Sequence, residues 1–274
     1  MGTVLEDRKS YRLSKIQRLI FGVIYLKCKG IVIGERLCNN NGKFIDFLTD
    51  EFGIIEVYQR GTQSIKNENR NSLQMFAYSN LCFGLNKDKI HYNVQSAELL
   101  EDFYGIRNDI VYFALASYMA QTIKYTLDKH STESKEVLRL LLNTLYYISN
   151  GTRNVEQLKS IFELRLLSLL GLAPNLLVCG RCELSLEDHA IYFSIPQNSA
   201  VCSKCANMND FKLSNGTFKS LRHIVYSDLN RLFNFKVDGQ SLKELSTITE
   251  RLLLYSLNRT FSTLKYYKSV SNIK

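Results

Sequence analysis

The chain has 274 residues, a formal net charge of +9, 45% hydrophobic residues and 22% charged residues. This composition is ordinary for a globular protein, and the length allows one large domain or two modest ones. No apolar run reaches the roughly 20 residues that cross a bilayer, so no membrane-spanning segment is expected. The seven cysteines are odd in number and four of them form two tight pairs, which argues against a secreted disulfide framework and favours a reducing compartment.

Positive charge gathers at the two ends of the chain. Residues 1–29 hold seven Lys and Arg against two acidic residues, and residues 206–274 hold eleven against five. The ends therefore carry +5 and +6, which leaves −2 for the middle. Such an excess indicates a polyanionic partner, with nucleic acid first and an anionic membrane second. A charge that serves only solubility is the simpler alternative.

The first 22 residues are predicted to be a mobile basic extension. An apolar run of eight residues, Leu19–Leu26, follows several basic residues, as in a signal peptide. It is too short, however, and no small-residue cleavage site follows it before Lys27 and Lys29.

Residues 23–95 have the pattern of short strands separated by turns. The Asn39–Gly42 stretch is a strong turn signal, and the polar stretch Gly61–Ser72 is expected to be an exposed loop. Five strands at this spacing predict a small closed β-barrel. The expected strands are Lys29–Ile33, Lys43–Leu48, Ile54–Tyr58, Met75–Phe83 and Lys89–Val94.

From residue 96 to residue 274 the apolar spacing becomes helical, and we expect an all-α domain interrupted by a cysteine-rich insertion at 176–210. One helix is expected to start at Asn154 with Gln157 completing a capping box, and Gly171 and Pro174 to end it. A last helix is expected from Ser241, with Glu244 completing a second capping box and Tyr255 on its buried side. The other expected segments are Ser96–Phe103, where Leu99, Leu100 and Phe103 have helical spacing, and Asp109–Leu127, Lys135–Ile148, Thr217–Tyr226 and Leu229–Phe235.

The insertion carries the most specific motif of the chain. Cys179 and Cys182 form one C-x-x-C pair, Cys202 and Cys205 form another, and 19 residues separate the pairs. Two such knuckles place four thiolates around one ion, so a structural Zn²⁺ site is predicted. An iron–sulfur cluster, two disulfides and free thiols are the alternatives. Because all four positions would be filled by protein, no open position for a catalytic water is expected.

Four common enzyme motifs are absent from the sequence. The sequence lacks the phosphate-binding loop, dinucleotide-binding, zinc-protease and nucleophile-elbow patterns. The four histidines are scattered singly, and His189 inside the cysteine loop is read as a surface residue. The expectation is a binding protein without catalytic residues.

Basic residues interleave with aromatic ones in two regions, a pattern suited to holding nucleic-acid strands by charge neutralisation and base stacking. A solvated face for the charges and core packing for the rings is the plainer alternative. The candidate DNA-binding residues are Lys29, Arg36, Lys43, Arg60, Lys66 and Arg70 in the barrel, and Lys219 and Arg222 near the end.

The order of these parts resembles the RecO family of bacterial recombination mediators. The resemblance covers about residues 26–274. Its marks are Lys29–Ile33, Phe47–Gly53, Arg60-Gly61 and the run Ile161–Pro174 leading into Cys179–Cys182. The chain differs from the family in its Cys38–Asn41 turn and in the sparse basic residues of Thr62–Arg70.

The resemblance implies an α+β protein in which an N-terminal OB-fold barrel precedes a helical domain that carries a zinc ribbon. It implies a non-enzymatic DNA-repair function in the cytoplasm at the nucleoid. Such a protein binds single- and double-stranded DNA, anneals complementary strands and helps load a recombinase onto strands coated by single-strand-binding protein. The implied partners are RecR and the acidic C-terminal tail of that coating protein.

Two other functions fit parts of the pattern. A zinc-ribbon factor of transcription or translation should prefer a defined sequence or RNA. A metal-dependent hydrolase should lose turnover on chelation without losing its fold, because it needs an open ligand position.

Overall fold

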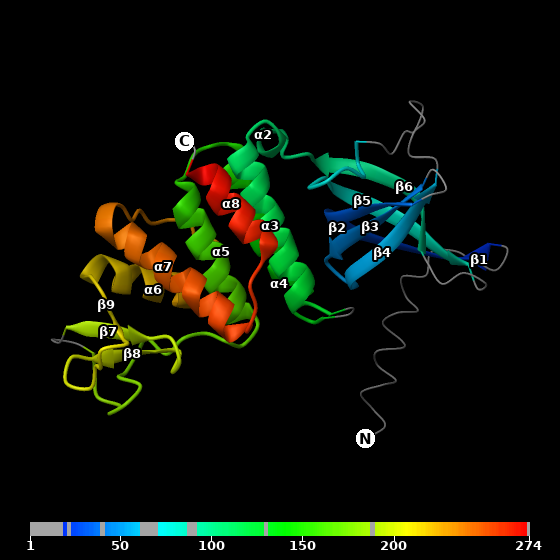
Figure 1. Cartoon of the computed structure of the whole chain (residues 1–274). Helices are drawn as coiled ribbons and strands as arrows, with labels where there is room; N and C mark the ends of the chain where they lie inside the picture. Colours follow the sequence, from blue (N-terminus) through cyan, green and yellow to red (C-terminus); the bar gives the residue numbers. More distant parts are fainter. Residues whose placement is uncertain are drawn as a thin grey trace, which may run out of the picture. The chain divides into compact units, whose positions relative to one another are not determined.

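The computed structural model describes residues 19–20, 23–38, 42–60, 71–86, 92–128, 131–186 and 190–272. It divides into two compact units: the described residues up to Phe103 together with 123–138, and residues 104–122 together with 139–272 (Figure 1). The predicted extension 1–22 lies outside the described residues except for strand β1 (Leu19–Ile20), which pairs with Val23 and Ile24.

The first unit is built on a closed five-stranded barrel (Figure 1). Its strands are β2 (Val23–Cys38), β3 (Gly42–Thr49), β4 (Gly53–Arg60), β5 (Tyr78–Asn86) and β6 (Tyr92–Glu101). The order β2-β3-β4-β6-β5 closes because β5 also pairs with β2. β4 and β6 run parallel, whereas the other barrel pairs are antiparallel. This Greek-key closure is that of an OB-like barrel and confirms the predicted fold class.

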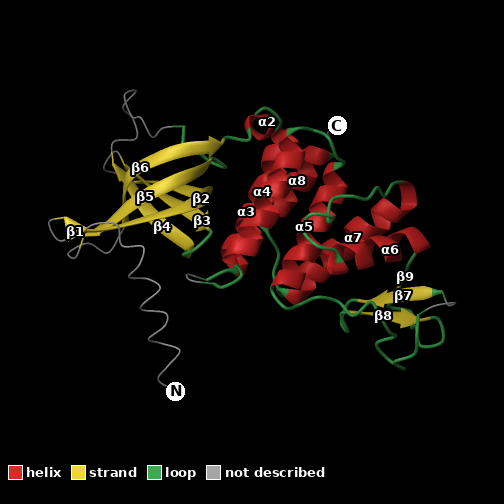
Figure 2. Cartoon of the chain, turned by 180° about the vertical axis from the view of Figure 1, so that it is seen from behind, coloured by secondary structure: helices red, strands yellow, loops and turns green. Residues whose placement is uncertain are grey.

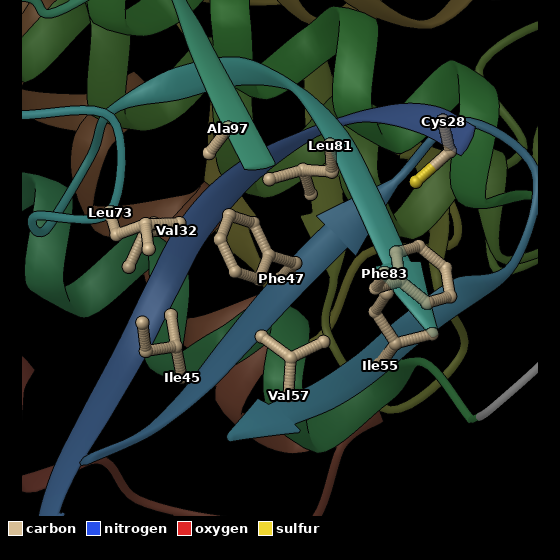
Figure 3. Close-up of a cluster of buried hydrophobic side chains, with 10 residues drawn as sticks. All are labelled: Cys28, Val32, Ile45, Phe47, Ile55, Val57, Leu73, Leu81, Phe83 and Ala97. Carbon is tan, nitrogen blue, oxygen red and sulfur yellow. The ribbon is translucent and has the colours of Figure 1, made fainter. Parts of the chain in front are cut away.

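Alternating apolar residues fill the barrel. Ile45 and Phe47 on β3 face Val57 and Ile55 on β4 in register, and all four are buried. Residues two apart share a face of a strand, so the alternation read from the sequence becomes one core. Figure 3 shows how these side chains converge with those of the neighbouring strands. Fully burying such a side chain contributes about 1.5–3 kcal/mol.

Strand β6 overturns the helix expected at Ser96–Phe103. The segment pairs antiparallel with β5 and, at Tyr92 and Asn93, parallel with β4. Leu99 and Leu100 suggested a helical face, yet they are 37% and 42% exposed, and Ala97 is the residue that enters the core. The fifth strand, expected to end at Val94, continues to Glu101, because its pairing with β5 outweighs the local helical spacing.

Within the described ranges, the remainder of the chain contains seven helices. They are α2 (Tyr104–Arg107), α3 (Ile110–Thr126), α4 (Ser134–Ser149), α5 (Val155–Leu169), α6 (Asn215–Tyr226), α7 (Gly239–Ser256) and α8 (Ser262–Ser271). The division between the two units passes through α3 and α4. α5 is buried around most of its circumference and packs against α6 and α7, as Figure 2 shows. Among the described residues, no helix is long and apolar enough to cross a membrane.

The predicted start of α5 is correct, although its capping box is only half formed. Asn154 Oδ1 accepts hydrogen bonds from the backbone N–H groups of Glu156 (2.8 Å) and Gln157 (3.3 Å). The Gln157 side chain does not return to Asn154; its Nε2 donates to the Phe235 carbonyl at 2.8 Å. A tertiary contact has replaced the second half of the motif.

The last predicted helix is two helices. α7 begins at Gly239, before Ser241, and ends at Ser256, and α8 begins at Ser262. Asn258 adopts a left-handed conformation (φ +47°), and the Arg259 N–H bonds back to the Leu254 carbonyl at 3.1 Å. This Schellman-type ending reverses the chain.

Three smaller predictions in the same region are wrong. Tyr255 is 56% exposed and does not lie on the buried side. Glu244 does not complete a capping box on α7, because its carboxylate accepts from Ser214 instead. Residues Leu229–Phe235 form turns rather than a helix.

The insertion forms a small three-stranded sheet next to α6 and α7 (Figure 2). Its strands are β7 (Ile191–Ser194), β8 (Ser199–Cys202) and β9 (Phe211–Lys212), with β7 in the middle. We call residues 176–210 together with β9 the ribbon.

Candidate metal centre and nucleic-acid interface

The four paired cysteines converge on one point of the ribbon. The Sγ atoms of Cys179, Cys182, Cys202 and Cys205 all lie within 4.8 Å of one another, and those of Cys182 and Cys202 are 3.8 Å apart. A tetrahedral zinc site with Zn–S bonds of about 2.3 Å places its sulfurs about 3.8 Å apart. The spacing therefore fits a four-thiolate metal site, which is the geometry that the two C-x-x-C pairs predicted.

Backbone N–H groups favour the deprotonated form of one of these thiols. Burial alone raises the pKa of Cys179, but N–H groups of Cys202, Cys182 and Arg181 lower it to about 6. Hydrogen bonds between Cys205 and the sulfurs of Cys182 and Cys202 favour the protonated Cys205 thiol and raise its pKa to about 12. The four sulfurs cannot all be thiolates side by side unless a cation offsets their repulsion, and a bound metal does this.

Close packing of the first knuckle against β8 depends on Gly180. Its N–H donates to the Ala200 carbonyl at 2.9 Å, and a Cβ at this position would lie 2.1 Å from Ser199 Oγ. Gly180, inside the first C-x-x-C pair, thus allows this close approach.

An ion pair that the sequence analysis missed ties the two ends of the ribbon together. The Arg181 guanidinium binds both carboxylate oxygens of Asp210, at 2.6 and 3.0 Å, and the Asp210 side chain is 2% exposed. Burial raises the pKa of Asp210, but Arg181 and the Asn207 N–H outweigh it and the net shift is downward. Arg181 lies between the first two cysteines, so its position was visible in the sequence, whereas its partner 29 residues later was not.

The barrel candidates differ in how accessible their charges are. Lys29 is exposed on β2. Arg36 has a 69% exposed side chain, pairs with Glu56 at 3.2 Å and lies over the Phe44 ring. Lys43 is only 13% exposed, and its Nζ binds Glu35 and the Leu73 carbonyl, each at 2.8 Å.

The remaining candidates fall into two groups. Arg60 is the last residue of β4, and its side chain, like Lys66 and Arg70, lies outside what the structure describes. Lys219 and Arg222 lie one turn apart on the exposed side of α6, with Arg222 5.7 Å from the centre of the Phe218 ring. The structure thus brings Lys219 and Arg222 together and leaves Lys43 with internal partners.

A buried charge network joins α3, α5, α7 and α8 and was also missed. Lys159 Nζ lies 2.9 Å from Glu163 and 3.0 Å from Glu250, which also pairs with Lys268. Glu163 accepts a further bond of 2.8 Å from Tyr118. Burial lowers the pKa of Lys159, but the two carboxylates more than compensate and keep it protonated. Such a network is structural, because removing one member would leave a buried charge unpaired.

Fold and site together define a class: a protein with an OB-like barrel, a helical unit and a four-cysteine ribbon. Comparison with known proteins identifies the family. The family model "Recombination protein O N terminal" matches residues 23–103, and "Recombination protein O C terminal" matches residues 107–265. The chain belongs to the RecO family of DNA repair proteins, as the resemblance in the sequence had indicated.

Curated relatives match along nearly their whole length. The DNA repair protein RecO of Acetivibrio thermocellus is 33% identical over 253 residues, covering 91% of this chain and 99% of the relative. That of Symbiobacterium thermophilum is 28% identical over 242 residues, covering 86% and 92%. That of Caldicellulosiruptor bescii is 25% identical over 245 residues, covering 89% and 98%.

Proposed function

We propose that this protein is a recombination mediator that works by binding DNA and not by catalysis. It binds single- and double-stranded DNA, anneals complementary strands and helps load a recombinase onto single strands coated by single-strand-binding protein. The observation that carries the proposal is an OB-like barrel in a chain that matches the RecO family from residue 23 to residue 265. OB-like barrels hold oligonucleotides with one face and its flanking loops.

The proposed DNA contacts use cations of the barrel unit and of α6. Lys29, Arg36, Arg60, Lys66 and Arg70 serve the barrel, and Lys219 and Arg222 provide a second basic patch. Lys43 is left out of the proposed contacts, because its ammonium already binds Glu35 and the Leu73 carbonyl. These cations neutralise phosphates and release counterions, which requires no particular base sequence.

The proposed metal is a structural Zn²⁺ held by Cys179, Cys182, Cys202 and Cys205. The donor set supports zinc, because four thiolates from two knuckles are the usual structural zinc ligands. When bound, the ion neutralises the thiolates and fixes the ribbon. Arg181 lies inside the first C-x-x-C pair and holds the far end of the ribbon through its ion pair with Asp210.

The proposed partners are RecR and the acidic C-terminal tail of single-strand-binding protein, and the proposed location is the nucleoid in the cytoplasm. The positive charge of residues 206–274 supports an acidic partner for the helical unit.

Strand annealing is the direct test of the proposal. Two complementary oligonucleotides, one labelled with a donor dye and one with an acceptor, should pair faster with the protein than without it. The acceleration should persist when single-strand-binding protein coats both strands. Equal annealing rates with and without the protein would refute the mediator function.

The salt dependence of DNA affinity tests the barrel contacts. Replacing Arg60, Lys66 and Arg70 by Gln removes three cations, so the slope of log affinity against log salt should fall by about 2 for a single strand. Replacing Lys43 by Gln is the matched control and should leave the slope nearly unchanged, because that cation already has protein partners. An unchanged slope in the triple variant would place the DNA elsewhere.

A further inference from the structure

An open groove lies between the ribbon and α7, and none of the candidate DNA-binding residues lines it. Its larger part has a volume of about 690 Å³, with Phe211 on the ribbon side and Arg251, Leu254, Tyr255 and Arg259 on the α7 side. A smaller hollow of about 180 Å³ shares the Phe211 wall and reaches toward the start of α7. We call the two together the α7 groove.

The α7 groove is strongly cationic. Lys212 and Lys243 line the smaller part, and Arg251 and Arg259 line the larger part. The acidic residue of the lining is Glu244, and its carboxylate is engaged by Ser214, Thr217 and Gln240. Its charge therefore faces internal donors, and the charge presented to a ligand is positive.

Aromatic and apolar surface accompanies the charge. The Tyr255 side chain is 56% exposed at the edge of the groove. The Arg251 guanidinium lies 4.9 Å from the centre of the Phe211 ring, which orients that cation along the wall. Single-strand recognition combines two elements: cations that bind the phosphates, and an accessible aromatic ring that stacks on a base.

Both walls of the groove are held in place. On the ribbon side, Phe211 pairs with Phe193 of β7, and the preceding Asp210 is fixed by Arg181. On the α7 side, the left-handed Asn258 turns Arg259 back over the last turn of the helix. A preformed site loses less entropy on binding than a mobile one.

We propose that the α7 groove binds a short segment of single-stranded DNA, with phosphates on Arg251 and Arg259 and a base on Tyr255. The inference rests on the proposed function and adds to it a second strand site in the helical unit. Two sites on one chain would let the protein hold two strands, as annealing requires.

A nucleic-acid strand fits better than an acidic peptide. Cations recur along the groove from Lys243 to Arg251, about 12 Å along the helix axis, as a repeating polyanion needs. A peptide with an aromatic end would need an enclosed apolar pocket for its ring, whereas here Tyr255 is itself exposed at the edge of an open groove.

Fluorescence anisotropy of the full chain with a labelled oligo-dT of about 12 nucleotides tests the site. Arg251→Gln with Arg259→Gln should weaken binding about tenfold and lower the salt slope by about 1.4, since two phosphate contacts are lost. Tyr255→Ala should weaken binding about fivefold or more, and Tyr255→Phe should restore it, because the ring that stacks is retained.

Matched controls remove the same charges and ring elsewhere. Lys135→Gln with Lys236→Gln changes two exposed cations outside the groove, and Tyr146→Ala removes a tyrosine that is 55% exposed on α4. Both should bind the oligonucleotide within about twofold of the unmodified chain. Thermal unfolding of each variant checks that the fold is intact.

The outcomes separate this inference from the proposed function. If the unmodified chain binds oligo-dT and the groove variants bind it equally well with the same slope, the groove assignment is wrong and the barrel proposal stands. If the groove variants lose only a labelled acidic peptide that ends in Phe, the site is a peptide site and the inference is overturned. If the unmodified chain binds no DNA, both the groove inference and the proposed function are wrong.

Discussion

The barrel and the ribbon are two small β-structures in one chain, and they are stabilised in different ways. The barrel strands are 8 to 16 residues long and enclose a core of buried apolar side chains. The ribbon strands have only 4, 4 and 2 residues, and the largest side chain that they bury is Phe193. A unit this small cannot build a sufficient core, so cross-links must supply the stability. In the ribbon these are the four-cysteine cluster and the Arg181–Asp210 pair.

The largest expected effect is on the ribbon. Replacing Cys182 by Ser removes one thiolate, and structural zinc contributes an apparent free energy of about 10–16 kcal/mol at neutral pH. The variant should lose its zinc, and amides of residues 176–210 should exchange with solvent as if unfolded, while the barrel stays protected. Mass spectrometry measures both. Cys38→Ser, outside the cluster, is the control, and a Cys182→Ser protein that kept one zinc and full protection would disprove the assignment.

The barrel should respond to loss of apolar volume instead. Phe47 is fully buried, so Phe47→Ala should reduce the free energy of unfolding by about 3–5 kcal/mol. Urea denaturation followed by barrel-specific hydrogen exchange measures this, with zinc content expected to be unchanged. Leu37 is 80% exposed, and Leu37→Ala should change stability by less than about 0.5 kcal/mol. Equal losses for the two variants would contradict the described core.

The second cross-link of the ribbon should matter less than the first. Asp210→Asn removes the charge from a buried bidentate pair and should cost the ribbon about 2 kcal/mol. We therefore expect the variant to release zinc faster to a coloured chelator at neutral pH. Asp228→Asn changes an exposed carboxylate and serves as the control. Identical release rates would mean that the cysteines alone hold the ribbon.

The smallest effect is expected where the ribbon leads into α6. Glu244 accepts from the Ser214 N–H at 2.9 Å and from Thr217 Oγ1 at 2.7 Å. Burial raises the pKa of Glu244, but these donors outweigh it and the net shift is downward. Glu244→Gln should therefore cost about 1 kcal/mol at pH 7.

The pH dependence of that difference has a definite sign. A carboxylate whose folded pKa lies below its unfolded value of about 4.3 stabilises the fold above that pH. The contribution is lost as the pH falls through the folded pKa, so the Gln variant and the unmodified chain should converge in strong acid. Thermal melts from pH 7 to pH 3 measure this. Asp238→Asn, whose carboxylate makes no cap bond, should show a smaller change, and a constant gap for Glu244→Gln would exclude the mechanism.

The sequence predicted most of the fold because its strongest signals are local. Alternation marked β3 and β4, Asn154 marked the start of α5, and the C-x-x-C pairs marked the cysteine cluster. The failures lie where partners are distant in the chain. β6 became a strand because it pairs with β5 and β4, and Glu244 left its predicted cap for Ser214, 30 residues away.

The candidate site divides in the same way. The four cysteines could be chosen from spacing alone, because a knuckle brings its own two ligands together. The accessibility of the cations could not be predicted from spacing. Only the folded chain shows that Lys43 is held by Glu35 and Leu73, while Lys219 and Arg222 share one exposed face.

By itself the sequence determined the family, the order of barrel, helices and ribbon, and the four cysteines that converge in the ribbon. These follow from short-range patterns, which are set by the period of strands and helices and by the reach of a two-residue knuckle. Only the tertiary structure decided which charges are buried, that Arg181 meets Asp210, and that Phe211 and Tyr255 line one groove. Those contacts join residues far apart in the chain, and their free energy exists only once the chain has closed around them.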